Sequence, residues 1–163
     1  MLFSCLAELP GDFHKKLKVC PQYNEFPPPM TEEDDNPAEA KLMDKASRTL
    51  SALAQDLEDT GMKDRRTLRA QLMIEELAET IEAMADGNIE QTFDGLLDLA
   101  YVLGGTFEVF GFRNVMEAGF AEVHRANMDK QGGDDTDRVR TKGDDWQPPQ
   151  LIQILQQGGH LFR

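Results

Sequence analysis

Two segments, LMIEELAETIEAM (residues 72–84) and FDGLLDLAYV (residues 93–102), indicate the fold of this chain most clearly. Both segments repeat apolar residues at helical spacing and contain no proline, so each predicts an amphipathic helix. Only the short stop Asp86-Gly87-Asn88 separates the two patterns. Helices joined by so short a turn pack antiparallel. We therefore expect an all-α protein, a helical bundle built on this antiparallel pair.

The rest of the chain adds further helices around the pair, without convincing β alternation or an internal repeat. Pro37 as a first helical residue and Gly61 just past a helix end delimit one of them. The expected helices cover residues 37–60, 64–85, 89–110, 114–129 and 149–157, with a shorter one near residues 12–17. The apolar residues expected to face the core are Leu42, Ala46, Leu50, Leu53 and Leu57 in the first helix and Leu68, Leu72, Leu77, Ile81 and Met84 in the second.

The composition limits the compartment and the partners. The chain has 163 residues and a net charge of −13, which argues against nucleic acid or an anionic membrane as a partner. Its two cysteines, Cys5 and Cys20, lack metal-type spacing and suit a reduced compartment. No stretch approaches the roughly 20 apolar residues that a membrane span needs, and the opening residues lack the basic region of a signal peptide. We expect a soluble cytoplasmic protein.

The two decisive helices carry acids without any neutralising base. Residues 71–111 contain nine carboxylates and no Lys, Arg or His. Residues three and four apart share a helix face. Two groups of acids are therefore expected to converge: Glu75, Glu76 and Glu79 on one helix, and Asp94 and Asp98 on the next. Four or five carboxylates at a helix seam suit Mg²⁺ or Mn²⁺, which are hard ions that prefer oxygen. The sequence thus predicts a carboxylate metal site.

A solvated acidic stripe is the alternative interpretation, and Glu82 and Asp86 extend that stripe. Asp98 weighs against it, because this residue lies in the apolar run 96–102, where an unpaired Asp is costly. Two other metal sites are excluded. A di-iron centre needs Glu-x-x-His repeats, and no His in this chain follows a Glu by three residues. An EF-hand over residues 129–140 lacks the Gly at its sixth position and the Glu at its twelfth.

Cationic residues gather near the end of the helix expected over residues 114–129. Arg125, Asn127 and Lys130 lie there, and Lys142 follows in a Gly/Asp-rich loop. Cations near a helix C-terminus suit the helix dipole, which is the simpler explanation. Arg, Lys and Asn donors facing a metal held by acids would also form a phosphate clamp. A triphosphate substrate needs both parts.

Four blocks of this sequence, in order, resemble the all-α nucleoside triphosphate pyrophosphohydrolases. The blocks are EELAET (75–80), DGLLDLAYVLGG (94–105), EVHRANMDK (122–130) and KGDDWQPP (142–149). This superfamily includes MazG, the dimeric dUTPases and the phosphoribosyl-ATP pyrophosphohydrolases. The chain is most similar to the single-domain MazG-like proteins of bacteria and phages, which include a dGTP-directed phage branch, MazZ. The resemblance covers about residues 66–149, with a weaker likeness at residues 12–15.

The resemblance implies a role for each acid. Glu75, Glu76, Glu79 and Asp98 would be the catalytic set and would bind two or more Mg²⁺ (or Mn²⁺) ions, with a glutamate of this set helping to activate water. Members of the family often have an acid three residues before Asp98, where this chain has Gly95. Asp94, one residue earlier, is therefore a further candidate ligand.

The resemblance also implies where the nucleotide binds. The phosphate-binding candidates are Asn127, Lys130, Lys142 and Arg125. The base-binding candidates are Phe13, His14, Lys15 and Trp146, of which Phe13 and Trp146 are otherwise interpreted as core or lid residues. Residues 1–36 would form an N-terminal segment of the nucleotide pocket. Residues 37–163 would form the pyrophosphohydrolase domain, with residues 31–63 as an insertion.

The reaction implied is hydrolysis of a (d)NTP between its α and β phosphates, giving (d)NMP and pyrophosphate. We expect (d)GTP as the substrate, with dUTP or dCTP as the alternative. Phosphoribosyl-ATP is a further alternative, although residues 94–102 and 124–130 look more MazG-like. A non-catalytic helical interaction module is the alternative from another class. The apolar face of helix 37–60, and the family's sites at subunit seams, predict a homodimer or a dimer of dimers, in the host cytoplasm if a phage encodes it.

Overall fold

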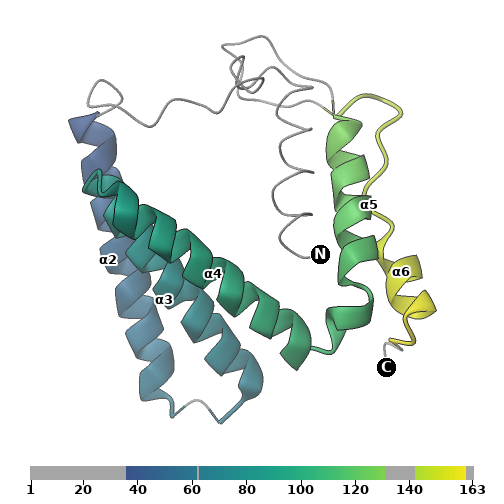
Figure 1. Ribbon diagram of the computed structural model, residues 1–163, viewed down its shortest axis with the longest axis horizontal. Coiled ribbons are helices and arrows are strands. Elements are labelled where there is room, and N and C mark those ends of the chain that lie inside the picture. The colour runs from purple at the N-terminus through teal and green to yellow at the C-terminus, as the bar shows by residue number, and fades with distance from the viewer. Residues whose placement is uncertain (1–35, 62, 131–141, 161–163) are drawn as a thin grey trace. The chain divides into compact units, whose positions relative to one another are not determined.

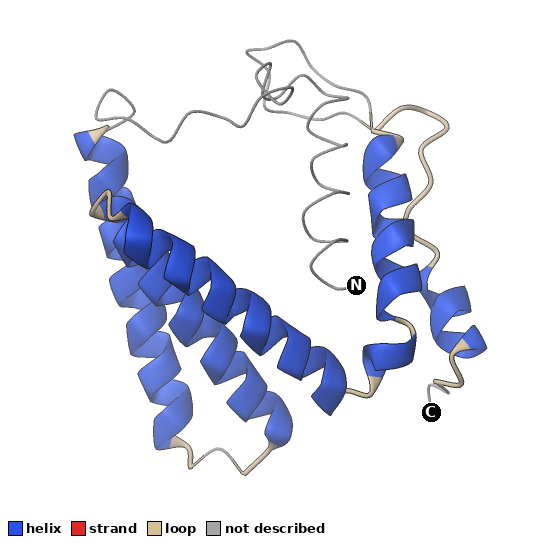
Figure 2. Ribbon diagram, viewed as in Figure 1, coloured by secondary structure: helices blue, strands red, loops and turns tan. Residues whose placement is uncertain are grey.

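The computed structural model describes residues 36–61, 63–130 and 142–160 (Figure 1). Every regular element in these ranges is helical (Figure 2). The elements are α2 (Pro37–Asp59), α3 (Arg65–Ala85), α4 (Ile89–Val109), the 3₁₀ turn η2 (Phe112–Asn114), α5 (Met116–Met128) and α6 (Leu151–Gln157). The all-α prediction is confirmed. The short helix expected near residues 12–17 lies outside the described residues.

Side-chain caps explain where the first three helices begin. The side chain of Asn36 accepts the backbone N–H of Ala38 at 3.1 Å, and Asp64 and Asn88 play the same part for α3 and α4. Such caps satisfy N–H groups that the first helical turn leaves unbonded. The predicted bounds of these helices are confirmed to within a residue. The helix expected from residue 114 begins later, at Met116, because the chain first makes the 3₁₀ turn η2.

The described residues divide into two compact units, one that ends at Gly111 and one that begins at Phe112. Among the described residues, the first unit holds α2, α3 and α4, and α3 packs against both of its neighbours. Arg69, early in α3, donates through Nε to Thr106 Oγ1, late in α4, at 3.0 Å. Thr80, late in α3, contacts Gly95, early in α4. The α3–α4 pair is therefore antiparallel, as predicted.

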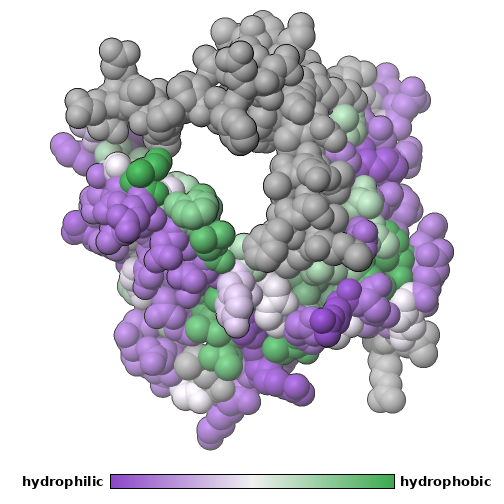
Figure 3. All heavy atoms as spheres, in the orientation of Figure 1, coloured by the Kyte–Doolittle hydropathy of each residue, from purple (hydrophilic) through white to green (hydrophobic). Residues whose placement is uncertain are grey.

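Small and short polar side chains fill the described part of this unit's interior. The buried residues are Ser47, Ala54, Gln71, Ala78, Thr80, Ala83, Gly95 and Val102. Helix axes that approach closely leave room only for small groups at the contact, and longer side chains then lie to either side. Several predicted core positions are therefore wrong: Leu42 is 67% exposed, Leu53 is 46% exposed, and Leu68, Leu77 and Met84 are also exposed. Hydrophobic side chains reach the visible surface along α4 (Figure 3).

The second unit is built on α5, with α6 running back along it. At one end of α6, the backbone N–H of Gln150 donates to Glu122 Oε1 at 2.9 Å. At the other end, Asn114 donates through Nδ2 to the carbonyl of Gly158 at 2.9 Å. From the start of α6 to its end, the bonded partner changes from Glu122 to Asn114, which lies earlier in the chain. Helix α6 is therefore antiparallel to α5. No helix in the described residues is long and apolar enough to cross a membrane.

Candidate functional site

Helices α3 and α4 approach each other closely where Thr80 meets Gly95. A Cβ atom placed on Gly95 would lie 2.6 Å from Thr80 Oγ1 and 3.1 Å from Thr80 Cα. Thr80 is 2% exposed, and its hydroxyl donates to the carbonyl of Glu76 at 2.7 Å. Glu79 precedes Thr80 directly, and Asp94 precedes Gly95 directly. This crossing therefore brings the acids of the two helices to one place.

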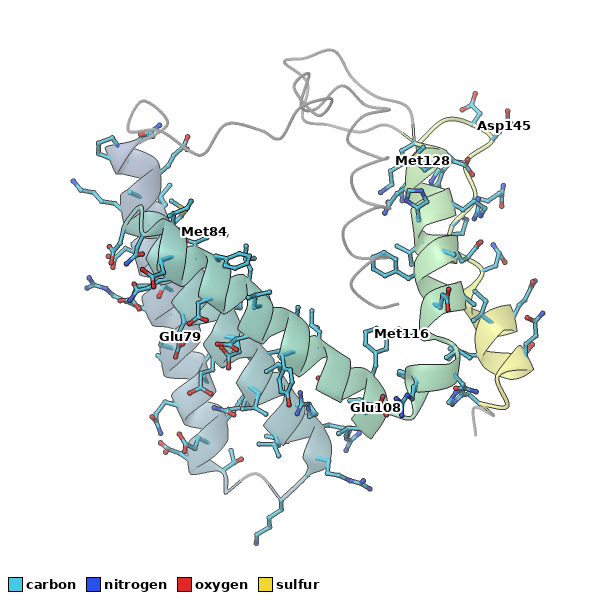
Figure 4. All side chains as sticks on the ribbon, in the orientation of Figure 1. Glu79, Met84, Glu108, Met116, Met128 and Asp145 are labelled. Carbon is cyan, nitrogen blue, oxygen red and sulfur yellow. The ribbon has the colours of Figure 1, made fainter. Side chains whose placement is uncertain are left out.

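A polar pocket of about 450 Å³ lies beside the crossing. Its acids are Glu79, Glu82, Asp86, Asp94 and Asp98, and Ala83, Gln91 and Gly95 complete the lining. Figure 4 labels Glu79 on α3. Glu82 and Asp86, interpreted from sequence only as a continuation of the stripe, are thus part of the pocket. Their helical spacing from Glu79, three and seven residues, was the signal that could have included them.

The pKa of Glu76 reflects the negative charges of acids on both helices. Its pKa is raised, first by burial and then by the negative charges of Asp98, Glu79, Glu75 and Asp94. Every charged group acting on Glu76 is an acid. A carboxyl group surrounded by like charges at reduced solvation favours its neutral form. The five acids predicted as metal ligands therefore form one electrostatic cluster.

The side chain of Glu75 has a defined partner within α3. Gln71, which is 6% exposed, donates from Nε2 to Glu75 Oε2 at 2.9 Å. A buried amide must satisfy its hydrogen-bonding groups, so this bond orients Glu75 from the packed side of the helix. Gln71 is a supporting residue that the sequence interpretation did not include.

The acids fit a hard divalent cation by their chemistry, although they are not arranged as a finished ligand set. Within residues 36–61, 63–130 and 142–160, no three His, Cys, Asp or Glu side chains lie close enough together to hold an ion as they stand. Ionised carboxylates repel and turn apart unless a cation lies between them. The donors, carboxylate oxygens on two packed helices, are those that Mg²⁺ and Mn²⁺ prefer. Metal binding stays a prediction.

Asp98 is exposed, contrary to the inference from its apolar neighbours. Leu96, Leu97 and Tyr101 are 46%, 44% and 82% exposed, so the apolar run does not enclose Asp98. The residue instead lines the acidic pocket. The site is thus a surface pocket of the described chain, and the apolar run is exposed at Leu96, Leu97 and Tyr101 but buried at Val102.

The structure explains why this chain has glycine at position 95 and its acid one residue earlier, at position 94. Gly95 is buried against Thr80, and no side chain fits there without displacing α3. Asp94, one residue earlier, lines the pocket and acts on Glu76. The acid that reaches the pocket from this part of α4 is therefore at position 94, and its role as a metal ligand stays a prediction.

Three of the phosphate-binding candidates lie toward the C-terminal end of α5. Lys130 donates through Nζ to Asn127 Oδ1 at 2.8 Å. Trp146 donates through its indole N–H to the carbonyl of Ala126 at 2.8 Å, and Lys142 Nζ lies 4.2 Å from the centre of the Trp146 ring. These contacts hold the segment of Lys142 against the part of α5 that carries Asn127. Phosphate binding by these residues stays a prediction.

Arg125 is engaged with other groups of the chain. It donates through Nε and Nη2 to both oxygens of Glu122, at 3.0 Å and 2.8 Å, and through Nη1 to Asp129 at 2.6 Å. These bonds hold the pKa of Glu122 down at about 2 and raise that of Arg125. Because the pKa of Glu122 is lowered on folding, its stabilisation is present above the ordinary value of 4.5 and is lost as the pH falls toward 2. The predicted contact of Arg125 with phosphate stays a prediction.

Of the base-binding candidates, only Trp146 lies within the described residues; Phe13, His14 and Lys15 lie outside them. Trp146 is half-buried, with its N–H bonded and Lys142 over its ring. An indole held in this way positions a loop, which agrees with the interpretation of Trp146 as a packing residue. Stacking on a nucleobase stays a prediction.

A second hollow, of about 680 Å³, lies at the start of α3. It is lined by Lys63, Asp64, Arg65, Arg66, Val109 and Phe110. Arg66 is paired with Asp64 at 2.5 Å, and this pair lowers the pKa of Asp64 to about 2. The hollow is shallow and open, and its charged groups partly compensate one another. The acidic pocket, whose charges are all of one sign, is the stronger candidate site.

Comparison with known proteins gives one match. A family model described as phosphoribosyl-ATP pyrophosphohydrolase matches residues 41–127, which is more than half of the chain. The match takes in most of α2, all of α3 and α4, and α5 as far as Asn127, so it contains all the acids of the pocket. It ends before Lys130 and Lys142. No curated protein and no solved structure matches the chain.

Proposed function

Since this chain belongs to the phosphoribosyl-ATP pyrophosphohydrolase family, we propose that it is a metal-dependent nucleoside triphosphate pyrophosphohydrolase. Membership in the family indicates a hydrolase of the pyrophosphohydrolase type. One observation carries the finer proposal: acids from α3 and α4 act together on Glu76 beside a pocket lined by five carboxylates. The reaction is (d)NTP and water to (d)NMP and pyrophosphate.

Acids of the pocket, together with Glu75 and Glu76 of α3, which do not line it, would hold the cations. Glu75, Glu76, Glu79 and Asp98 are the proposed ligands, and Asp94 joins them because it lines the pocket and acts on Glu76. Two or more bound Mg²⁺ or Mn²⁺ ions would supply charge neutralisation for the phosphates and a lowered pKa for water. A glutamate of the set then accepts the proton of the attacking water. The raised pKa of Glu76 reflects repulsion that bound cations would relieve.

The cationic side chains of the second unit would bind the phosphate groups. Lys130 now donates to the neutral Asn127 amide, and Lys142 lies over an indole ring. Both ammonium groups have weak partners, so exchange for a phosphate oxygen makes a stronger, charge-assisted contact. The Asn127 amide would donate to the same substrate through its N–H₂ group.

We propose (d)GTP as the substrate, with dUTP or dCTP as the alternative. Phosphoribosyl-ATP is a second candidate, favoured by the description of the matching family. A non-catalytic helical module is the third, in which the acids are only a solvated stripe.

A pyrophosphate-release screen tests these candidates directly. The full chain is incubated with each ribo- and deoxyribonucleoside triphosphate and with phosphoribosyl-ATP, in the presence of Mg²⁺ or Mn²⁺. We expect release from guanine nucleotides, abolished by a chelator. Release from dUTP, dCTP or phosphoribosyl-ATP alone would replace the proposed substrate, and no release from any of them would favour the non-catalytic module.

We also propose that the protein is a homodimer or a dimer of dimers. The sequence interpretation placed the seam on α2, whose Leu42 is 67% exposed, and α4 also carries exposed apolar side chains. Ile89, Phe93 and Tyr101 of α4 are 60%, 64% and 82% exposed. Because exposed apolar faces mark interaction surfaces, we propose that α4 takes part in the interface.

Light scattering checks the assembly. We expect a mass of two or four chains at micromolar concentration, and a shift to the monomer when Phe93 and Tyr101 are replaced together by Ser. A stable monomer of the unmodified chain would contradict the proposal.

A further inference from the structure

The segment 142–150 is held against one face of α5. Trp146 donates to the carbonyl of Ala126 at 2.8 Å, and the backbone N–H of Gln150 donates to Glu122 Oε1 at 2.9 Å. Arg125 adds longer contacts from Nη2 to the carbonyls of Gln147 at 3.5 Å and Pro148 at 3.4 Å. The α5 residues involved are 122, 125 and 126, whose spacing puts them on one side of the helix. The segment therefore docks at one place on α5.

The centre of this docking is the ion pair of Glu122 and Arg125. The pair is a fork, with both carboxylate oxygens accepting from the guanidinium. Glu122 has a side chain only 18% exposed, and that of Arg125 is 39% exposed. Forked pairs of this kind have a defined geometry as well as a favourable energy. Arg125 is also fixed from the other side by Asp129. The pair is thus held rigidly on α5.

Segment 142–150 has few backbone groups that can form hydrogen bonds within the segment. Pro148 and Pro149 have no N–H to donate, so these residues present carbonyls without a ladder or a helix to join. The Arg125 guanidinium donates to the carbonyls of residues 147 and 148. The Glu122 carboxylate accepts from the next backbone N–H in the chain, that of Gln150. Arg125 therefore adds a donor to these carbonyls, of which that of Pro148 also accepts from Gln150 Nε2 at 3.0 Å, and Glu122 supplies the acceptor for the Gln150 N–H. Lys142 lies at the start of this segment and contacts Trp146 within it.

We propose that Glu122 and Arg125 are positioning residues that hold segment 142–150 on α5, so that Lys142 meets the same phosphate groups as Asn127 and Lys130. The inference rests on the proposed function, in which Lys142 binds phosphate. It gives Arg125 an indirect role: the guanidinium binds the loop, and the loop presents the lysine. Neither Glu122 nor Arg125 touches the substrate in this arrangement.

Trp146 provides a direct readout, because it is the only Trp in the chain. Its emission reports whether the indole is docked on Ala126 or exposed to water. The variants are Arg125→Gln, Arg125→Lys, Glu122→Gln, Lys142→Ala and the double variant Arg125→Gln with Lys142→Ala. Each full chain is studied by Trp emission and acrylamide quenching, and by calorimetric titration with inorganic pyrophosphate in the presence of Mg²⁺.

We expect Arg125→Gln and Glu122→Gln to shift Trp146 emission to the red and to increase its quenching. We expect Arg125→Gln to weaken pyrophosphate binding about tenfold, the size of one lost charge-assisted contact. Lys142→Ala should weaken it by a similar factor, and the double variant should be no weaker than Lys142→Ala alone. Arg125→Lys keeps one charge-assisted bond and should lie between Arg125→Gln and the unmodified chain.

Other outcomes overturn the inference in distinguishable ways. Losses that multiply to about a hundredfold in the double variant would show that Arg125 contacts phosphate itself. An exposed Trp146 with unchanged pyrophosphate affinity would leave the pair with a structural role only, and an unshifted Trp146 would show that the pair does not hold the segment. If the unmodified chain binds no pyrophosphate, the proposed function fails and the role of Lys142 fails with it, whatever Trp146 reports.

Arg48→Gln is the matched control. Arg48 pairs with Asp44 at 2.9 Å in another helix, α2, and its side chain is 79% exposed. The same substitution there removes an ion pair without touching segment 142–150. Trp146 emission and pyrophosphate affinity should both stay unchanged.

Discussion

Asp98→Asn is expected to abolish the binding of Mg²⁺ or Mn²⁺ and to lower pyrophosphate release by about a hundredfold or more. The substitution keeps the size of the side chain and removes one ligand charge from the pocket between α3 and α4. Glu79→Gln should have the same effect from the opposite helix. Calorimetric titration with Mn²⁺ measures the first effect, and steady-state pyrophosphate release measures the second.

In the metal-free protein, by contrast, removing one of these charges should increase the stability of the fold. The raised pKa of Glu76 means that its charge is disfavoured in the folded chain, with Asp98 the largest charged cause after burial. Such a group stabilises the fold below its ordinary pKa, and this contribution is lost as the pH rises through the raised value. Asp98→Asn and Glu76→Gln remove part of that repulsion. Both variants should therefore raise the melting temperature of the metal-free protein above neutral pH, while added Mn²⁺ no longer raises it further.

Asp56→Asn is the control for this pair of effects, because Asp56 is an exposed residue of α2 and does not line the pocket. It should alter neither metal binding nor turnover. If Asp98→Asn and Glu79→Gln both bind Mn²⁺ with unchanged affinity, the acids are a solvated stripe and the metal site does not exist.

Gly95→Ala is expected to destabilise the chain by about 1–2 kcal/mol, although alanine is the better helix former. Alanine gains roughly 0.5–1 kcal/mol over glycine within a helix. Its Cβ would lie 2.6 Å from Thr80 Oγ1 and 3.1 Å from Thr80 Cα, and overpacking of this kind costs about 1–3 kcal/mol. The helices must move apart, and the acids of α4 move away from those of α3. Urea unfolding measures the stability, and Mn²⁺ titration should show weakened binding.

Gly119→Ala supplies the comparison. Gly119 lies within α5, and a Cβ there meets nothing within 4 Å. This substitution should stabilise the chain by roughly 0.5–1 kcal/mol through helix propensity alone. If Gly95→Ala stabilises the chain to the same extent and leaves metal binding intact, the crossing at Thr80 does not set the geometry of the pocket.

Local patterns predicted the helices because their causes are local. Asn36, Asp64 and Asn88 cap the helix starts, and Gly61 and Gly87 follow the helix ends in the left-handed conformation. The buried faces were harder to predict. Leu42 and Leu53 looked like core positions, but Ser47 and Ala54 are the buried residues of α2. The hydrophobic pattern indicates only approximately which side of a helix is buried. Where two helices pack closely, the residues at the contact are small.

Helical spacing and a short turn were enough to predict that the chain is helical, that α3 and α4 form an antiparallel pair, and that acids on both should meet. Which acids line the pocket could not be predicted in this way, since it depends on where the helices cross. The contact of Thr80 with Gly95 places Asp94 and Asp98 with Glu79, and adds Glu82 and Asp86. Long-range contacts also set the hydrogen-bond partners of Arg125, which include a segment more than twenty residues further along the chain. No local pattern encodes a contact between residues so far apart.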